Sequence, residues 1–127
     1  MLEDGGLGPA VDSKLNHRLG GFAEELADRQ AGPHAHQIRL DPTGKWAVVM
    51  DLGTDVVYAY RFDDRTGCLS GSATSAHHLV LPVGAGPRHL DFSPDGKFAY
   101  VKDQQSPIRT FDFEQSHMSS TGLSDSL

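Results

Sequence analysis

Two short polar segments carry the side chains best suited to acid–base chemistry and anion binding: PHAH, which ends at His36, and PRH, which ends at His89. The imidazole of His36 titrates near neutral pH and can activate a water molecule as a general base. The guanidinium group of Arg88 can bind a carboxylate or phosphate through two hydrogen bonds, or stabilise an oxyanion. We take His36 and Arg88 as candidate catalytic residues. Their neighbours His34 and His89 are candidate substrate-binding residues.

The two segments open two copies of one pattern, which cover residues 33–53 and 87–105. Each copy continues with an alternating apolar run, a turn that contains Pro and Gly, and a run rich in β-forming residues. His36 aligns with Arg88 at an offset of 52 positions, and the same offset joins the turn prolines and glycines. If the opening segment begins the innermost strand of a propeller blade, both side chains face the mouth of the central channel at the same height.

A fixed period of this size, made of short strands and turns, is typical of repeated propeller blades. A third strand over residues 56–62 is matched by residues 108–113 at an offset of 51, so the second copy has lost one residue near 103–107. We expect an outer fourth strand within 76–83. Two unrelated hairpins that share a turn type are the alternative, but the match runs through three strands in order. The sequence therefore predicts an all-β fold, a partial β-propeller of antiparallel four-stranded blades whose ring is not closed.

Three segments follow from this repeat. Residues 33–85 are expected to form a complete blade. Residues 86–127 are expected to form an incomplete blade with a frayed C-terminus, because the sequence after Phe113 is polar, Ser-rich and without β periodicity. Residues 1–32 are a lead-in, which we interpret as the tail of a preceding blade plus a connection. Its residues 21–30 have weak helical spacing, but a surface connection is favoured.

Composition restricts the function classes. The chain has 127 residues, a net charge of −6, 14 glycines and 7 prolines, which suits a turn-rich β protein. The negative charge offers neither a basic surface for nucleic acid nor a polybasic patch for a membrane. The single cysteine, Cys68, excludes an internal disulfide and fits a reducing compartment. No apolar run approaches about 18 residues and no signal peptide is evident, so we expect a soluble, cytoplasmic protein without nucleic-acid or membrane partners.

Five motifs occur in an order that resembles the lactonase family of seven-bladed β-propellers: PHAH, DP-x-GK, DLGTD, GAGPRH and SPDGKFAYV. This family includes 6-phosphogluconolactonases and carboxymuconate-lactonising enzymes, and the resemblance is close over residues 30 to about 101. It implies hydrolysis of an anionic sugar lactone such as 6-phosphogluconolactone, in the pentose phosphate pathway of carbohydrate metabolism. It also implies that His36 activates water for attack on the lactone carbonyl and that Arg88 anchors the anion. We expect no cofactor.

The chain departs from the family pattern in two respects. The family has a Glu shortly after the AYV run, and its position falls here on Gln104, or on Asp103 if the deletion lies earlier. Glutamine cannot act as a base but can hydrogen-bond a substrate, so Gln104 is a third candidate substrate-binding residue. A closed ring of this type needs about seven blades, whereas the chain holds one full blade and part of another. We therefore expect low activity from this chain alone.

Structural roles are the alternatives for several of these residues. His34 and His36 are two positions apart on a strand and could ligate a metal, but the absence of a nearby Cys and of a carboxylate at a telling spacing argues against a metal site. Histidines in such strands are commonly half-exposed with satisfied nitrogens, a group that comprises His34, His77, His78 and His89. Asp51 and Asp55 are expected to cap a tight strand connection. Arg88 could instead brace a loop.

Two hypotheses of different class follow. In the first, the chain is a lactonase-type enzyme, or a carboxymuconate lactone cyclase of the same family. In the second, it is a non-catalytic β-propeller fragment that acts as an interaction or structural module. An open ring leaves strand edges unpaired, and such edges invite self-association.

Overall fold

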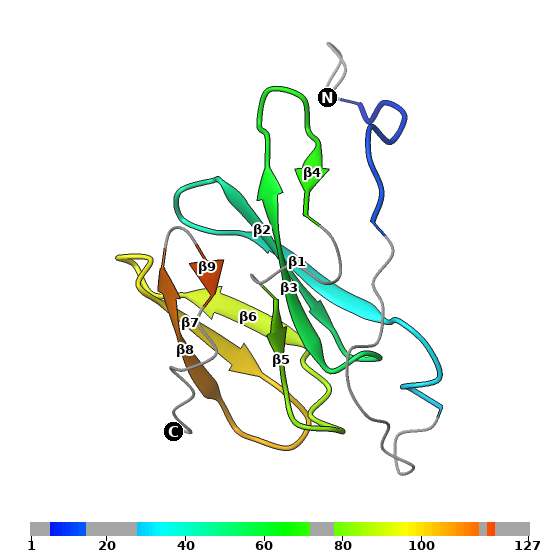
Figure 1. The fold of residues 1–127 in the computed structure, drawn as a ribbon, viewed down its shortest axis with the longest axis vertical. Helices are drawn as coiled ribbons and strands as arrows, with labels where there is room; N and C mark the ends of the chain where they lie inside the picture. Colours follow the sequence, from blue (N-terminus) through cyan, green and yellow to red (C-terminus); the bar gives the residue numbers. More distant parts are fainter. Residues whose placement is uncertain (1–5, 15–27, 72–77, 115–116, 119–127) are drawn as a thin grey trace.

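The computed structural model describes residues 6–14, 28–71, 78–114 and 117–118. Every regular element within these residues is a β-strand, and the strands form two neighbouring antiparallel sheets (Figure 1). The all-β class and the antiparallel blades are thus confirmed, and the two sheets do not close into a ring. In the part of the chain that the structure describes, no helix has the length and hydrophobicity needed to cross a membrane.

The first sheet has the strand order β1-β2-β3-β4, and β5 also pairs with β3. Its strands are β1 (Ala35–Leu40), β2 (Trp46–Asp51), β3 (Val56–Phe62), β4 (Leu69–Ser70) and β5 (Leu79–Val80). β4 pairs with the end of β3, and β5 pairs with its start. The fourth strand expected within 76–83 is present as β5, but it shares the outer position with β4, which the sequence pattern did not indicate.

The second sheet has the strand order β6-β7-β8-β9. Its strands are β6 (His89–Phe92), β7 (Phe98–Lys102), β8 (Arg109–Glu114) and β9 (His117–Met118). The short strand β9 pairs antiparallel with the end of β8, while most of the segment expected to fray after Phe113 lies outside the described residues. Backbone pairing needs no apolar alternation, so the polar composition of this segment did not reveal it.

Each blade's first hairpin is closed by a side-chain oxygen and a glycine. In the first blade, Asp41 Oδ1 accepts hydrogen bonds from the backbone amides of Lys45 (3.0 Å) and Trp46 (2.8 Å). In the second blade, Ser93 Oγ accepts from the amide of Phe98 (3.0 Å). The turn glycines adopt left-handed φ values of 70° and 72°, a conformation that glycine adopts without steric cost. The repeated Pro–Gly turn is therefore real and sets the register of both hairpins.

The main hydrophobic core lies between the two sheets. Each sheet contributes one face, because alternate residues of a strand point to opposite sides. The cluster comprises Trp46, Val48, Met50, Val57, Ala59, Leu79, Leu81, Ala85, Leu90, Ala99, Val101, Phe111 and Phe113. A smaller cluster of Val49, Val56, Tyr58 and Tyr60 covers the other face of the first sheet. The two blades are thus packed face against face.

The inner strands of the two blades are linked directly. The backbone amide of Leu90 in β6 donates to Gln37 Oε1 in β1 (2.7 Å). Nearby, the Arg39 guanidinium pairs with the Asp91 carboxylate at 2.9 Å, an exposed pair whose own contribution to stability is small. These contacts fix β1 beside β6 and so bring the two polar opening segments together.

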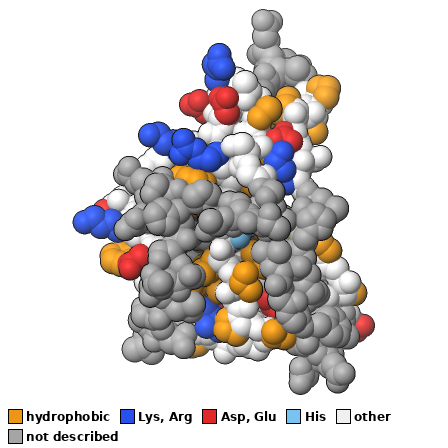
Figure 2. Space-filling view, viewed as in Figure 1, with side chains coloured by type: hydrophobic (Ala, Val, Ile, Leu, Met, Phe, Trp, Pro, Cys, Tyr) orange, Lys and Arg blue, Asp and Glu red, His pale blue; other side chains and the backbone are white. Residues whose placement is uncertain are grey.

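Residues 6–14 of the lead-in lie beside β4 at the outer edge of the first sheet (Figure 1). Residues 6–14 contain no strand, and Asp12 Oδ2 accepts from the amide of Leu69 at the start of β4 (2.7 Å). Residues 28–30 form a turn, while most of the 21–30 stretch with helical spacing lies outside the described residues. Figure 2 shows acidic and basic side chains together in the upper part of the molecule and hydrophobic side chains lower on the same face.

Candidate functional site

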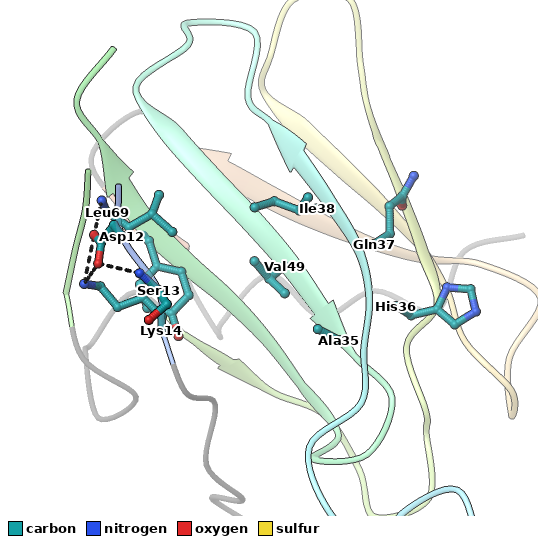
Figure 3. A pocket seen from close by; sticks show the side chains of 10 residues that line it. Asp12, Ser13, Lys14, Ala35, His36, Gln37, Ile38, Val49 and Leu69 are labelled. Carbon is teal, nitrogen blue, oxygen red and sulfur yellow. Dashed lines mark hydrogen bonds and ion pairs between the residues drawn. The ribbon is translucent and has the colours of Figure 1, made fainter. Parts of the chain in front are cut away.

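His36 occupies a β-bulge at the start of β1. Ala35 pairs with Asp51 and Gln37 pairs with Met50, so β1 advances two residues while β2 advances one, and His36 is the extra residue. A bulge redirects the side chain that it carries. Figure 3 shows His36 and Gln37, although consecutive, leaving β1 on the side opposite to Ala35 and Ile38. His34 precedes β1, so the regular strand spacing considered for a metal-binding His34–His36 pair is not formed.

Arg88 stands at the equivalent place in the second blade. His89 pairs with Lys102, as Gln37 pairs with Met50 at the same offset of 52, so Arg88 corresponds to His36. The amide of Arg88 donates to the carbonyl of Lys102 (2.9 Å). The alignment of the two sequence copies therefore describes a real structural equivalence.

A cavity of about 330 Å³ lies between these two positions. Its lining residues are Arg29, His34, Ala35, His36, Leu52 and Arg88. Three residues selected from the sequence, His34, His36 and Arg88, thus meet in one cavity. Arg29 was not selected, because it lies in a lead-in without periodicity or repeat partner. Four of the six lining side chains are basic and none is acidic, in a chain of net charge −6.

A neighbouring cavity of about 360 Å³ contains the other two candidates. It is lined by Arg88, His89, Lys102, Asp103 and Gln104, so Arg88 belongs to both cavities. The rings of His36 and His89 meet edge to face, with centroids 4.9 Å apart and planes at 89°. All five candidate residues therefore lie in one continuous region at the ends of the inner strands, although their roles stay predictions.

Two side chains in this region hold buried donors without an acceptor. Arg88 Nε and Gln104 Nε2 are both buried, and neither forms a hydrogen bond with any of the residues that the structure describes. Buried polar groups are nearly always hydrogen-bonded, so each exception needs an explanation, and a bound ligand that accepts these hydrogen bonds would supply one. Both positions considered for the family Glu, Asp103 and Gln104, line the cavity, but they differ in their partners. The Asp103 carboxylate is held in a buried ion pair with Arg109, whereas Gln104 Nε2 has no acceptor in the described structure.

Matching aspartates cap the turn after the second strand of each blade. Asp51 Oδ1 accepts from the amides of His34 (2.8 Å), Gly53 (3.0 Å) and Thr54 (3.1 Å). Asp103 Oδ1 accepts from the amides of Gln105 (2.9 Å) and Ser106 (2.5 Å) at the same place in the second blade. This is the capping role expected for Asp51, and it also fixes the backbone at His34.

Asp55 joins three segments. This residue is buried and has a left-handed φ of 58°. Its carboxylate accepts from Gln30 Nε2 (2.6 Å) and from the amides of Gly84 (2.8 Å) and Gly86 (2.8 Å). Gln30 follows Arg29 and Gly86 precedes Arg88 by two residues, so one carboxylate binds both arginine-bearing segments, the first through a side chain and the second through backbone amides.

A further cavity of about 390 Å³ lies along β1 and is lined by Ala35, His36, Gln37 and Ile38 of that strand (Figure 3). The lead-in supplies Asp12 to it, and the first sheet supplies Ile38, Val49 and Tyr60. The hydrogen bond from Leu69 and the contact with Lys14 lower the pKa of Asp12 below its usual range. Burial, followed by the charges of Tyr58 and Asp51, raises the pKa of Tyr60 to about 12. The phenol stays protonated and the Asp12 carboxylate is paired with Lys14. His36 lines this cavity too, but the cavity that it shares with Arg88 adds an anion-binding group, so lactone chemistry is better placed there.

Of the two histidines before β5, His78 has a structural role and His77 lies outside the described residues. His78 Nδ1 accepts from the amide of Ala59 (3.1 Å), and its ring packs against Tyr58 and Tyr60. Among the described ranges, no group of three or more His, Cys, Asp or Glu side chains is close enough to hold a metal ion.

Comparison with known proteins gives a consistent set of similarities. A family model described as lactonase, seven-bladed β-propeller, matches residues 2–123. The 6-phosphogluconolactonase of Bacillus subtilis is 36% identical over 106 residues, which cover 84% of this chain and 27% of that protein. The structure of the periplasmic gluconolactonase of Pseudomonas aeruginosa superposes with a TM-score of 0.75 at 29% identity, covering 99% of this chain and 34% of that one. A Lactobacillus plantarum protein superposes with a TM-score of 0.70 at 30% identity and similar coverage.

The chain spans about a quarter to a third of the length of these relatives. The predicted partial propeller with an open ring is thereby confirmed.

Proposed function

Because the chain belongs to the lactonase family of seven-bladed β-propellers, we propose that the cavity between His36 and Arg88 serves the hydrolysis of a sugar lactone, such as 6-phosphogluconolactone, to the open acid. One observation carries this proposal. A candidate general base and a candidate anion-binding group, at equivalent positions of neighbouring blades, line the same cavity.

The proposed reaction uses these two groups in sequence. His36 takes a proton from a water molecule whose oxygen attacks the lactone carbonyl carbon, and the carbonyl electron pair moves onto its oxygen. Arg88 stabilises the oxyanion of the tetrahedral intermediate. When the intermediate collapses, the bond to the ring oxygen breaks, and the imidazolium returns its proton to that oxygen. The products are a carboxylic acid and a free hydroxyl group, which together account for the lactone and the water.

The neighbouring residues support the same chemistry. The edge of the His89 ring contacts the His36 ring, which restricts the orientation of the proposed base. The buried Nε of Arg88 is available to an incoming oxygen. The basic lining suits a substrate with a negative charge. In this proposal the reaction belongs to carbohydrate metabolism in the cytoplasm, within the pentose phosphate pathway.

Replacing the proposed base tests the proposal. We expect His36→Gln to lower kcat for lactone hydrolysis by about 100-fold or more, because general-base catalysis contributes on this order. His34→Gln is the comparison variant, since it makes the same change in the same cavity, and we expect it to alter KM more than kcat. The rate is measured as the excess over spontaneous hydrolysis in buffer. No excess rate for the unmodified chain, or an excess that His36→Gln leaves unchanged, contradicts the proposal.

A non-catalytic module is the second candidate. It is favoured by apolar side chains that stay exposed on the outer faces of both sheets, among them Ile38 and Tyr100. In that case the chain binds other polypeptides through these faces and shows no excess hydrolysis. A cyclase acting on carboxymuconate lactone is the third, and assaying both lactones side by side separates it from the first.

A further inference from the structure

We propose that Arg29 and Arg88 form a two-point anion clamp, in which Arg29 binds the phosphate of a phosphorylated lactone while Arg88 serves the reacting carbonyl. The inference rests on the proposed function and adds to it a residue that decides between phosphorylated and unphosphorylated substrates. Arg29 lies in the turn before β1, far from Arg88 in sequence, yet both side chains line one cavity.

The electrostatics of this cavity favour a second anionic group. Arg29, His34, His36 and Arg88 line it without a carboxylate. Neither arginine forms an ion pair with any acidic side chain in the described ranges. The carboxylates of the adjoining turn are occupied, since Asp51 accepts from backbone amides, as described above. No described carboxylate therefore neutralises either guanidinium group, and both can interact with an anion bound in the cavity.

The segments that carry the two arginines are linked by the Asp55 carboxylate. Asp55 Oδ1 accepts from Gln30 Nε2 (2.6 Å), next to Arg29, and from the amide of Gly86 (2.8 Å), shortly before Arg88. Hydrogen bonds to a buried charged group are stronger than those between neutral groups. The segment of Arg29 is thus linked to this atom through the Gln30 side chain, and that of Arg88 through the Gly86 amide. A ligand that contacts both arginines therefore meets preorganised segments.

Burial assigns different roles to the two guanidinium groups. Arg88 is half-buried and its buried Nε lacks an acceptor in the described structure. A desolvated donor of this kind is most effective where charge develops during the reaction, as on an oxyanion. Arg29 is exposed, so it suits a charge that is equally present in substrate and transition state. Such uniform binding lowers KM without changing kcat.

Phosphate is the anion that fits the exposed position best. A guanidinium group presents a planar pair of N–H donors that matches phosphate through two hydrogen bonds. An unphosphorylated sugar has a neutral hydroxyl at the same point and gains nothing from the positive charge. We therefore expect Arg29 to discriminate between sugar acids that differ only in a phosphate.

The test measures the binding of two reaction products by the full chain. The probes are 6-phosphogluconate and gluconate, which share the carboxylate and differ in the phosphate, and titration calorimetry or NMR gives each Kd. We expect Arg29→Ala to weaken 6-phosphogluconate about tenfold or more and to leave gluconate nearly unchanged. Arg29→Lys keeps the positive charge but lacks the planar pair of N–H donors. Its affinity for 6-phosphogluconate should therefore lie between those of the unmodified chain and Arg29→Ala.

Arg65→Ala is the matched control. Arg65 is exposed in the loop between β3 and β4, and its removal changes the net charge by the same amount. Equal weakening in Arg29→Ala and Arg65→Ala overturns the clamp, since it reduces the effect to long-range charge. Equal weakening of both ligands in Arg29→Ala, or no binding of 6-phosphogluconate to the unmodified chain, also overturns it. Phosphate-selective binding without any hydrolysis leaves the clamp in place and removes the proposed function instead.

Discussion

At the scale of single residues, the candidate site depends on a side chain that does not line it. Asp55 is buried and left-handed, and its carboxylate holds one side chain and two backbone amides from different segments. The second copy has one residue fewer in the corresponding turn, as the offsets of the flanking strand pairs show. In the described structure, Asp55 of the first blade provides the link to the connection that leads into Arg88.

Replacing Asp55 should cost more stability than a typical surface change. Asp55→Ala removes the acceptor of three hydrogen bonds and leaves buried donors unsatisfied, so we expect a loss of about 3 kcal/mol in the free energy of unfolding. Asp55→Asn keeps one acceptor oxygen, and asparagine tolerates the left-handed backbone. We therefore expect it to lower the free energy of unfolding by about half as much as Asp55→Ala. Urea denaturation of the three proteins measures both values. Equal stability of Asp55→Ala and the unmodified chain would show that the carboxylate does not hold these segments.

Residue types and repeat spacing sufficed to select His36 and Arg88, because equivalent positions of a repeat fall at equivalent places in space. Arg29 could not be selected in this way. It has no partner at the repeat offset, and its place in the cavity depends on the Gln30–Asp55 contact between distant segments. The bulge at His36 was also beyond sequence patterns, since it is a property of the pairing with β2.

At the scale of elements, the turn after β2 passes directly over the backbone that enters β1. A Cβ atom added at Gly53 would overlap the carbonyl oxygen of Gly32 and stand 2.8 Å from the amide nitrogen of His34. Only a residue without a side chain allows this close approach. The turn and the entry to β1 therefore act as one packed unit that places His34 and His36.

A pair of glycine variants tests this packing. Gly53→Ala must displace residues 32–34, so we expect it to lower the free energy of unfolding by about 2 kcal/mol and to reduce lactone hydrolysis. Gly32→Ala is the matched control, because its added Cβ meets no atom within 4 Å. It should change stability by no more than about 0.5 kcal/mol. Thermal denaturation and the hydrolysis assay check both, and similar behaviour of the two variants would contradict the close approach.

The long strands and their turns were predictable from the sequence because alternation, β-forming residues and Pro–Gly turns all indicated the same elements. The two-residue strands β4 and β9 were not, since so short a segment has no periodicity to detect. Each exists because the edge of a longer strand offers unpaired backbone groups to the chain that returns beside it.

At the scale of the whole molecule, the faces buried between the two blades have counterparts that are exposed on the outside of the chain. The face of the first sheet that packs on the second includes Trp46, Val48 and Val57. Their counterparts in the second blade are Phe98, Tyr100 and Ile108, which are 37%, 38% and 38% exposed. Conversely, Leu90 is buried between the blades, whereas its counterpart Ile38 is 58% exposed. Each exposed outer face thus corresponds, position by position, to a face of the other blade that is buried within the chain.

This repetition predicts head-to-tail self-association through faces, in addition to the strand edges considered from the sequence. The outer face of the second sheet in one copy should pack against β1 of the next copy, as the two blades pack within the chain. Such a contact joins different surfaces and does not stop at a dimer. Sedimentation velocity should therefore show species larger than a dimer as the concentration rises.

Tyr100→Lys places a charge on the proposed contact face and should shift the chain towards the monomer, because an unpaired charge is costly to bury. Val83→Lys is the matched control, since Val83 is 46% exposed and lies in the connection after β5, outside both strand faces. It introduces the same charge and should leave association unchanged. An unmodified chain that stays monomeric at every concentration, or two variants that dissociate alike, would mean that the exposed faces do not recognise one another.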